Sequence, residues 1–327
     1  MARVAAIDCG TNSLRLLVAD VDRQAGRLAD VDRRMEIVRL GQGVDATGRL
    51  SQEALSRTLH ALRGYARIIV ETAAGAVRMV ATSAARDAAN AADFVRGVSE
   101  VLGLEPEVLS GQEEAYLSFT GATAELAKRP DARYLVVDIG GGSTEFVLGG
   151  GGSGNGGGNA GAGAGKLPGG AGITAASVDV GCVRLTERHL HGDPPAAAEI
   201  AAAAADIDAA LDVVAAAMPA AEAHTLVGLA GSVTTVAALA LRLPGYDAGL
   251  IHHSRIRAEE VSEQTSRLLR QTRAQRAALG VMHPGRADVI GGGALILDRL
   301  MQRFGFAEVL VSEHDILDGI AWALAGR

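Results

Sequence analysis

One short pattern occurs twice in this chain, and it restricts the possible fold more than any other feature of the sequence. Residues 4–18 and 134–148 each read as an apolar run, Asp, any residue, Gly, two residues, Ser and a second strand-like run. The shared positions are Asp8, Gly10 and Ser13 in the first copy and Asp138, Gly140 and Ser143 in the second. The pattern predicts two hairpins. Because a strand follows the glycines, it excludes the dinucleotide-binding fingerprint and the P-loop, which both open into a helix.

A glycine-rich hairpin can bind an anion. Its backbone N–H groups point at one spot and form a nest that suits phosphate, and nearby side chains add donors. The acid at the strand end, Asp8 or Asp138, is placed to hold a hydrated Mg²⁺ or to orient a water molecule. Two such hairpins, one per domain, would clamp a phosphate chain from both sides of a cleft. The alternative is two ordinary turns, because turns favour Asp and Gly anyway.

The candidate phosphate-binding residues are Gly10, Thr11, Asn12, Ser13, Gly140, Gly141, Gly142 and Ser143, with the hydroxyl of Thr144 as a further donor.

Two adjacent glutamates stand in the first turn of the helix predicted after Ser110. Ser110 and Glu113 have capping-box spacing, which gives Glu113 a structural role. Glu114 points about 100° away around the helix, on a face that continues with Leu117 and Ser118. A carboxylate with such neighbours is poorly solvated and is therefore a stronger base. The alternative is a solvated first-turn acid that the helix dipole favours.

Arg86 follows the strand predicted at residues 77–81 and is the best candidate for a side-chain contact to phosphate. Guanidinium groups bind phosphate through two hydrogen bonds; a surface salt bridge is the alternative. Arg15 and Arg39 are weaker candidates of the same kind. We interpret the pair His314-Asp315 as structural.

Length and composition limit the class of protein. A chain of 327 residues predicts about two domains. No apolar run reaches the roughly 18–20 residues that span a bilayer, and residues 1–4 run straight into a strand-like segment without a signal peptide. We therefore expect no membrane association.

Charge and cysteine content add two further expectations. Cys9 and Cys182 lie far apart and outside any metal-ligand cluster, which favours a reducing, cytoplasmic compartment. The net charge of −7 argues against broad nucleic-acid binding. A polyanionic substrate would therefore need a local cluster of arginines, amides and a cation. The Gly-rich residues 149–172 cannot bury apolar surface, and we expect a disordered surface loop there.

The motifs taken together resemble a known family. Within the superfamily of actin, sugar kinases and heat-shock chaperone ATPases, the chain is similar to the exopolyphosphatase and guanosine pentaphosphate phosphohydrolase (Ppx/GppA) family. The similarity covers nearly the whole chain in order. The matching stretches are AAIDCGTNSLRLLVAD, VRLGQGVD, ATSAARDAAN, SGQEEAYLSFTGA, LVVDIGGGSTEFVLG, DVGCVRLTER, GLAGSVTTVAAL, HPGRADVIGGGALIL and SEHDILDGIA.

This resemblance implies a fold. We expect an α/β protein of two actin-like (ribonuclease H-like) domains, each with a mixed five-stranded sheet and flanking helices, and an active site in the cleft between the domains. Residues 1–125, completed by 307–327, would form the first domain, and residues 126–306 the second. The chain resembles the short, two-domain members, which argues against processive degradation of very long substrates. The resemblance is the only basis for expecting a homodimer.

The resemblance also assigns roles. It makes Glu114 the base for an attacking water, Arg86 a residue that reaches into the phosphate cleft, and residues 10–13 and 140–143 the phosphate-binding loops. Asp138 and Glu145 would be acids linked to Mg²⁺, or another divalent cation such as Mn²⁺, and to water. With Asp8 they form the expected metal set.

The implied activity is metal-dependent hydrolysis of the terminal phosphoanhydride of inorganic polyphosphate, with release of orthophosphate. The nearest alternative is a guanosine pentaphosphate 5′-phosphohydrolase, which uses the same chemistry. More distant alternatives are an ATP-dependent kinase and a non-catalytic sensor of polyphosphate or nucleotide.

Overall fold

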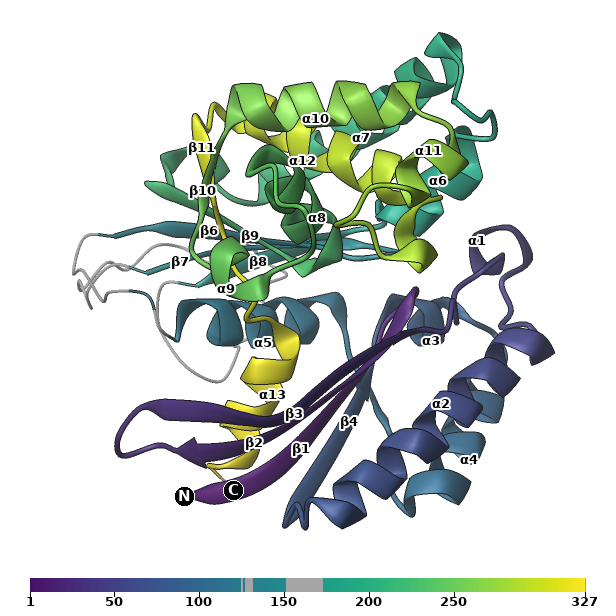
Figure 1. Cartoon of the computed structure of the whole chain (residues 1–327), viewed down its shortest axis with the longest axis vertical. Coiled ribbons are helices and arrows are strands. Elements are labelled where there is room, and N and C mark those ends of the chain that lie inside the picture. The colour runs from purple at the N-terminus through teal and green to yellow at the C-terminus, as the bar shows by residue number, and fades with distance from the viewer. Residues whose placement is uncertain (125, 127–131, 151–172, 327) are drawn as a thin grey trace. The chain divides into compact units, whose positions relative to one another are not determined.

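The computed structural model of the chain describes residues 1–124, 126, 132–150 and 173–326 (Figure 1). Most of the Gly-rich segment for which the sequence predicts disorder, residues 149–172, lies outside the described residues. The chain divides into two compact units. Unit 1 comprises Met1–Gly121 and His314–Arg327, and unit 2 comprises Ala122–Glu313.

The described part of unit 1 contains a five-stranded mixed sheet with the order β3-β2-β1-β4-β5. The strands are β1 (Ala2–Cys9), β2 (Ser13–Asp22), β3 (Arg27–Ile37), β4 (Ala76–Ala81) and β5 (Glu107–Val108). β2 pairs antiparallel with both β1 and β3, whereas β1, β4 and β5 run parallel to one another. Because parallel strands end at the same edge of a sheet, the segments that follow β1, β4 and β5 lie near one another.

Helices cover both faces of this sheet (Figure 1). The helices that begin in unit 1 are α1 (Val44–Thr47), α2 (Gln52–Glu71), α3 (Ser83–Asp87), α4 (Ala91–Leu102), α5 (Gly111–Thr123) and α13 (Ile316–Leu324). Successive residues of β1 point to opposite faces. Ala5 and Ile7 pack in the core beneath α2 and α4, whereas Val4 and Ala6 pack in the core beneath α13. Asp8 continues the row of Val4 and Ala6, so its side chain lies on the α13 face.

Two glycines allow α5 and α13 to cross closely. A Cβ atom on Gly121 would lie 1.9 Å from the carbonyl oxygen of Asp315, and one on Gly319 would lie 2.0 Å from that of Leu117. No side chain fits at either position, which is the usual reason for glycine where two backbones approach. The crossing lies where the chain leaves unit 1 after Gly121 and returns at His314.

Unit 2 contains, within its described residues, a six-stranded mixed sheet with the order β10-β11-β9-β6-β7-β8. The strands are β6 (Tyr134–Ile139), β7 (Thr144–Gly149), β8 (Thr174–Val178), β9 (Thr225–Leu229), β10 (Arg255–Arg257) and β11 (Glu308–Val311). β11 pairs in parallel with β9. The strand at 308–311 therefore belongs to the second sheet and not, as the sequence division had it, to the first domain. This sheet also has one strand more than the five expected.

Helices pack on one face of the second sheet (Figure 1). The helices of unit 2 are α6 (Cys182–His189), α7 (Ala197–Ala217), α8 (Ala230–Ala240), α9 (Ala248–Ile251), α10 (Ala258–Arg270), α11 (Arg273–Ala277) and α12 (Ile290–Phe304), with short 3₁₀ turns at Ala220–Glu222 and Pro284–Arg286. The core between helices and sheet contains Leu135 and Phe146, and the ring of Phe146 meets that of Phe304 edge to face, with the centroids 6.5 Å apart. The α/β class, with two mixed sheets and flanking helices, is confirmed.

Two general expectations concern cysteines and membranes. Cys9 and Cys182 are both buried free thiols, one in each unit. None of the helices in the described ranges combines the length and the apolar character that crossing a bilayer requires.

Candidate active site

Asp138 and Glu145 face each other across the second hairpin. They are cross-strand partners in the antiparallel pair of β6 and β7, so both side chains project from the same face of the sheet. Both are buried, and the hydroxyl of Ser177 on β8 donates a hydrogen bond to Oε1 of Glu145 at 2.9 Å. Two adjacent carboxylates suit a hard divalent cation, and Mg²⁺ in particular is usually held by one or two carboxylates together with substrate phosphates and water.

The second loop has its carbonyl groups turned into the protein. The N–H of Gly140 donates to the carbonyl oxygen of Ser143 at 3.1 Å, which closes the turn. At the start of α6, Cys182 N–H donates to the carbonyl oxygen of Gly140 and Val183 N–H to that of Gly141, each at 2.9 Å. An anion-binding loop must keep its carbonyl oxygens away from the anion, and here the first turn of α6 holds them.

Close packing fixes this loop against α6. A Cβ atom on Gly181, the residue that precedes α6, would lie 2.4 Å from the carbonyl oxygen of Gly141 and 2.6 Å from the nitrogen of Gly142. Glycine is therefore required at position 181 so that the helix end can lie directly on the loop backbone.

The first loop has the same construction. The N–H of Gly10 donates to the carbonyl oxygen of Ser13 at 2.9 Å. The carbonyl oxygens of Thr11 and Asn12 accept hydrogen bonds of 2.8 to 3.1 Å from backbone N–H groups of residues 38–41. The two hairpins predicted from the internal repeat are thus confirmed as matched turns of one type.

Backbone N–H groups of both loops are candidate donors to an anion. Those of Thr11, Asn12, Gly141, Gly142 and Ser143 donate to no other residue within the ranges that the structure describes. Side-chain hydroxyls contribute less than the sequence suggested. Thr144 is buried and donates to the carbonyl oxygen of Val180 at 2.6 Å, which removes it as a phosphate donor. Thr11 shares a 2.8 Å hydrogen bond with the Ser83 hydroxyl at the start of α3.

The two hairpins differ in the residue that faces the acid present in both turns. Asp138 faces Glu145, whereas Asp8 faces Arg15 at the equivalent register position. Nε and Nη2 of Arg15 both donate to Oδ2 of Asp8, at 3.0 and 2.6 Å. The second hairpin therefore presents two acids, and the first an acid–arginine pair.

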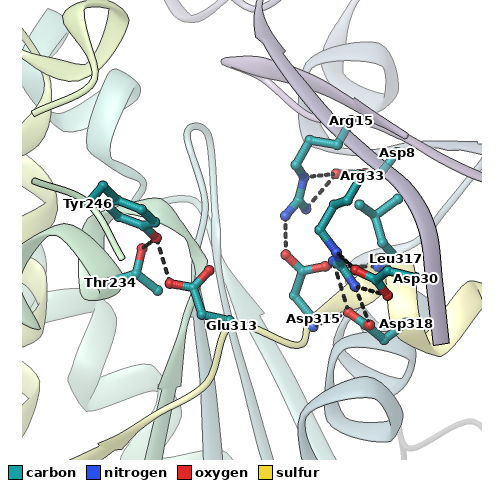
Figure 2. A network of polar contacts seen from close by, with 10 residues as sticks. All are labelled: Asp8, Arg15, Asp30, Arg33, Thr234, Tyr246, Glu313, Asp315, Leu317 and Asp318. Atoms are coloured by element: carbon teal, nitrogen blue, oxygen red, sulfur yellow. Dashed lines mark hydrogen bonds and ion pairs between the residues drawn. The ribbon is translucent and has the colours of Figure 1, made fainter. Parts of the chain in front are cut away.

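Arg15 also binds the N-cap residue of α13, as Figure 2 shows. Its Nη1 donates to Oδ2 of Asp315, while Oδ1 of Asp315 accepts from the N–H of Leu317 at 2.9 Å and caps the helix. Burial raises the pKa of the Asp8 carboxyl; Arg15 acts in the opposite direction, and the charge of Asp315 adds to the rise. A second arginine, Arg33 on β3, donates to Oδ1 of Asp318 at 2.6 Å.

Arg86 and Glu114 come together in unit 1. Nη1 of Arg86 lies 3.4 Å from Oε2 of Glu114 and donates to the carbonyl oxygen of Leu109 at 2.9 Å. Glu114 is buried, with 8% of its surface exposed, as expected for a poorly solvated carboxylate. The shared sheet edge explains this proximity, because α3 follows β4 and α5 follows β5.

The neighbouring Glu113 has the predicted structural role. The backbone N–H and hydroxyl of Ser110 donate to Oε2 of Glu113 at 2.9 and 2.8 Å, and the Glu113 N–H lies 3.3 Å from the Ser110 hydroxyl. The capping box is confirmed, so the two adjacent glutamates are in different environments.

The metal set expected from the sequence is divided between the units. Asp8 belongs to unit 1, and Asp138 and Glu145 belong to unit 2. Throughout the described ranges, no three or more His, Cys, Asp or Glu side chains form a cluster able to hold a metal ion. Neither the contact of Ser177 with Glu145 nor that of Asp315 with Arg15 was predicted from the sequence. The N-cap position of Asp315 has a local signal, but its partner lies 300 residues away.

A family model and a named relative each match nearly the whole chain. The model of the Ppx/GppA phosphatase family matches residues 17–325. A protein named Exopolyphosphatase 2 from Mycobacterium tuberculosis is 49% identical over 337 aligned residues, covering 100% of this chain and 99% of that protein.

Solved structures are similar along the whole chain. The crystal structure of an exopolyphosphatase-like protein is 40% identical, covers 98% of both chains and has a TM-score of 0.88. The Aquifex aeolicus PPX-GPPA enzyme is 29% identical, with coverage of 98% of this chain and 99% of that chain, and a TM-score of 0.77. The chain belongs to the Ppx/GppA phosphatase family.

Proposed function

We propose that this protein is an exopolyphosphatase that hydrolyses the terminal phosphoanhydride bond of inorganic polyphosphate and releases orthophosphate. The observation that carries the proposal is the second hairpin. There two buried acids, Asp138 and Glu145, lie beside a loop whose carbonyl groups accept hydrogen bonds from the first turn of α6. The identity of 49% to a protein named Exopolyphosphatase 2 supports the same substrate.

The chemistry needs a site for a highly charged phosphoryl group. Phosphoryl transfer is catalysed mainly by positioning and by neutralising the charge on the phosphate oxygens. Backbone N–H groups of residues 10–13 and 140–143 would bind these oxygens. A divalent cation, Mg²⁺ or Mn²⁺, would be held by Asp138 and Glu145, with Asp8 as a further acid, and would supply additional positive charge.

Arg86 and Glu114 are assigned to the attack of water. Arg86 would exchange its contact with Glu114 for one with a phosphate oxygen, which leaves the Glu114 carboxylate to accept a proton. Water attacks the terminal phosphorus, its proton passes to Glu114, and the bond to the bridging oxygen breaks. The products are orthophosphate and a chain shorter by one unit.

The fold and chemistry also suit guanosine pentaphosphate, so the test compares substrates. Phosphate release is measured from polyphosphates of several lengths and from guanosine pentaphosphate at matched concentrations. We expect higher kcat/KM for polyphosphate, loss of activity with a chelator, and recovery with Mg²⁺ or Mn²⁺. Higher kcat/KM for the nucleotide would reassign the substrate. Phosphoryl transfer to a small acceptor would indicate a kinase, and ligand binding without phosphate release would indicate a sensor.

We also infer that the chain acts in the cytoplasm and as a homodimer. Two buried free thiols suit a reducing compartment, and family resemblance supports the dimer. Sedimentation of the purified chain tests the oligomeric state, and a monomer at micromolar concentration would refute the proposed homodimer.

A further inference from the structure

One oxygen of the Asp8 carboxylate is buried and receives no hydrogen bond. Oδ1 of Asp8 has no partner among the described residues, while both hydrogen bonds from Arg15 go to Oδ2. The Asp8 side chain is only 3% exposed. A buried acceptor without a partner is costly unless another group binds it, so Oδ1 is the atom on which a ligand of the first hairpin would be expected.

Arg15 is shared between two carboxylates. Its three guanidinium nitrogens are divided, with Nε and Nη2 on Asp8 and Nη1 on Asp315 (Figure 2). The group of three therefore carries a net charge of −1. If Arg15 faced Asp8 alone, the pair would be neutral, and a cation near Oδ1 would meet the full repulsion of the guanidinium.

Asp315 is fixed by contacts other than Arg15. Its Oδ1 caps α13 through the N–H of Leu317, and its own N–H donates to Oδ2 of Asp318 at 2.9 Å. The position of the carboxylate that attracts Arg15 is thus set by the first turn of the helix.

We infer that Asp315 is a positioning residue for the first hairpin: it holds Arg15 so that Asp8 keeps Oδ1 and a net negative charge available for a divalent cation. The inference rests on the metal dependence in the proposed function and extends it to a residue outside the repeated hairpins. Asp315 is the second residue of unit 1 after the chain returns from unit 2. The charge of the first hairpin is thus linked through one side chain to the segment that joins the units.

The test measures binding of Mn²⁺ alone to the full chain, by the loss of the free-ion resonance signal. Asp315→Asn keeps an N-cap oxygen, because Asn caps helices well, and removes the charge. We expect its affinity for Mn²⁺ to fall about tenfold, as is typical when the partner of a metal-binding residue is changed.

Asp318→Asn is the matched control. Asp318 lies in the same helical turn and pairs with an arginine, Arg33, but does not contact Arg15. The amide oxygen of an asparagine at this position can still accept the hydrogen bond from the Asp315 N–H. We expect its affinity to change much less.

A double-mutant cycle with Asp8→Asn separates positioning from general loss of charge or fold. If Asp315 acts through Asp8, then Asp315→Asn has little further effect on Mn²⁺ affinity once Asp8 is Asn. Equal affinity of wild type and Asp315→Asn, or full additivity in the cycle, would overturn the inference. These outcomes are independent of phosphate release. A wild type that hydrolyses polyphosphate while Asp315→Asn binds Mn²⁺ normally refutes only this inference, and the reverse pattern refutes only the proposed function.

Discussion

The guanidinium of Arg86 contacts the buried carboxylate of Glu114, with 3.4 Å between Nη1 and Oε2. The contact joins a residue that follows β4 to one that follows β5, two strands that pair in parallel in the sheet. It places a positive charge beside the best candidate for a general base. Because we propose different roles for the two residues, we expect substitution of Glu114 to change mainly kcat and substitution of Arg86 to change mainly KM.

Substitution of Glu114 tests the base. Glu114→Gln should lower kcat by about 10²–10⁴-fold with KM nearly unchanged, because the amide keeps the shape but cannot accept the proton. The matched control is Glu113→Gln, since glutamine also forms a capping box, and this variant should retain activity. Near-normal turnover of Glu114→Gln in a phosphate-release assay would contradict the assignment of Glu114 as the general base.

Substitution of Arg86 tests the phosphate contact. Arg86→Lys keeps the charge and loses the fork of two donors, so we expect KM to rise and kcat/KM to fall about tenfold or more, in line with the 1.5–3 kcal/mol of a charged hydrogen bond. Arg78→Lys, on the strand β4 that precedes α3, is the control, because Arg78 pairs with the exposed Glu107. Equal effects of the two variants would contradict the prediction.

The capping box predicts a pH-dependent contribution to stability. Hydrogen bonds from the Ser110 backbone and then its hydroxyl lower the pKa of Glu113 below its ordinary value of 4.5. Because the folded-state pKa is the lower one, the stabilisation is present above 4.5 and is lost as the pH falls through the folded-state value. Glu113→Ala should cost about 1 kcal/mol at neutral pH. Urea unfolding well below pH 4.5 should show little difference, and an equal cost at both pH values would be inconsistent with this origin.

Two glycine substitutions should have opposite effects. Gly181→Ala places a Cβ against the second loop and should cost about 1–3 kcal/mol, with a loss of activity because the phosphate cradle shifts. Gly64→Ala, in the interior of α2, meets no atom within 4 Å and should stabilise the fold by about 0.5–1 kcal/mol. Thermal unfolding and phosphate release measure both, and an active, stable Gly181→Ala would show that the loop tolerates displacement.

Local features could be read from the sequence because the atoms that determine them are near in the chain. The two Asp-x-Gly hairpins are of this kind. The Ser110–Glu113 capping box is another. Because the capping role accounts for Glu113, the sequence singled out Glu114 as the poorly solvated glutamate, and Glu114 is buried in the structure. The activity of these residues is still a prediction.

Other features depend on distant partners or lack an apolar pattern. β3 was not predicted because none of its residues is buried, and its sequence, rich in charged residues, lacks the continuous apolar run of the other predicted strands. β11 was given to the wrong sheet because a short apolar strand does not identify its neighbour. Thr144 was taken as a phosphate donor because its acceptor, the carbonyl oxygen of Val180, lies 36 residues away.

The matched hairpins suggest how the two halves of the chain diverged. If they arose by duplication of one ancestral segment, the copies have retained the turn and its acid and have changed the charge seven positions later, to Arg15 in one and Glu145 in the other. A single inherited design would then have acquired two specialised forms, with selection acting on one facing position. Exchange of the two residues between the halves would move the acid pair to the first hairpin and the acid–arginine pair to the second, and the metal requirement of that variant would show whether each half is suited to one form only.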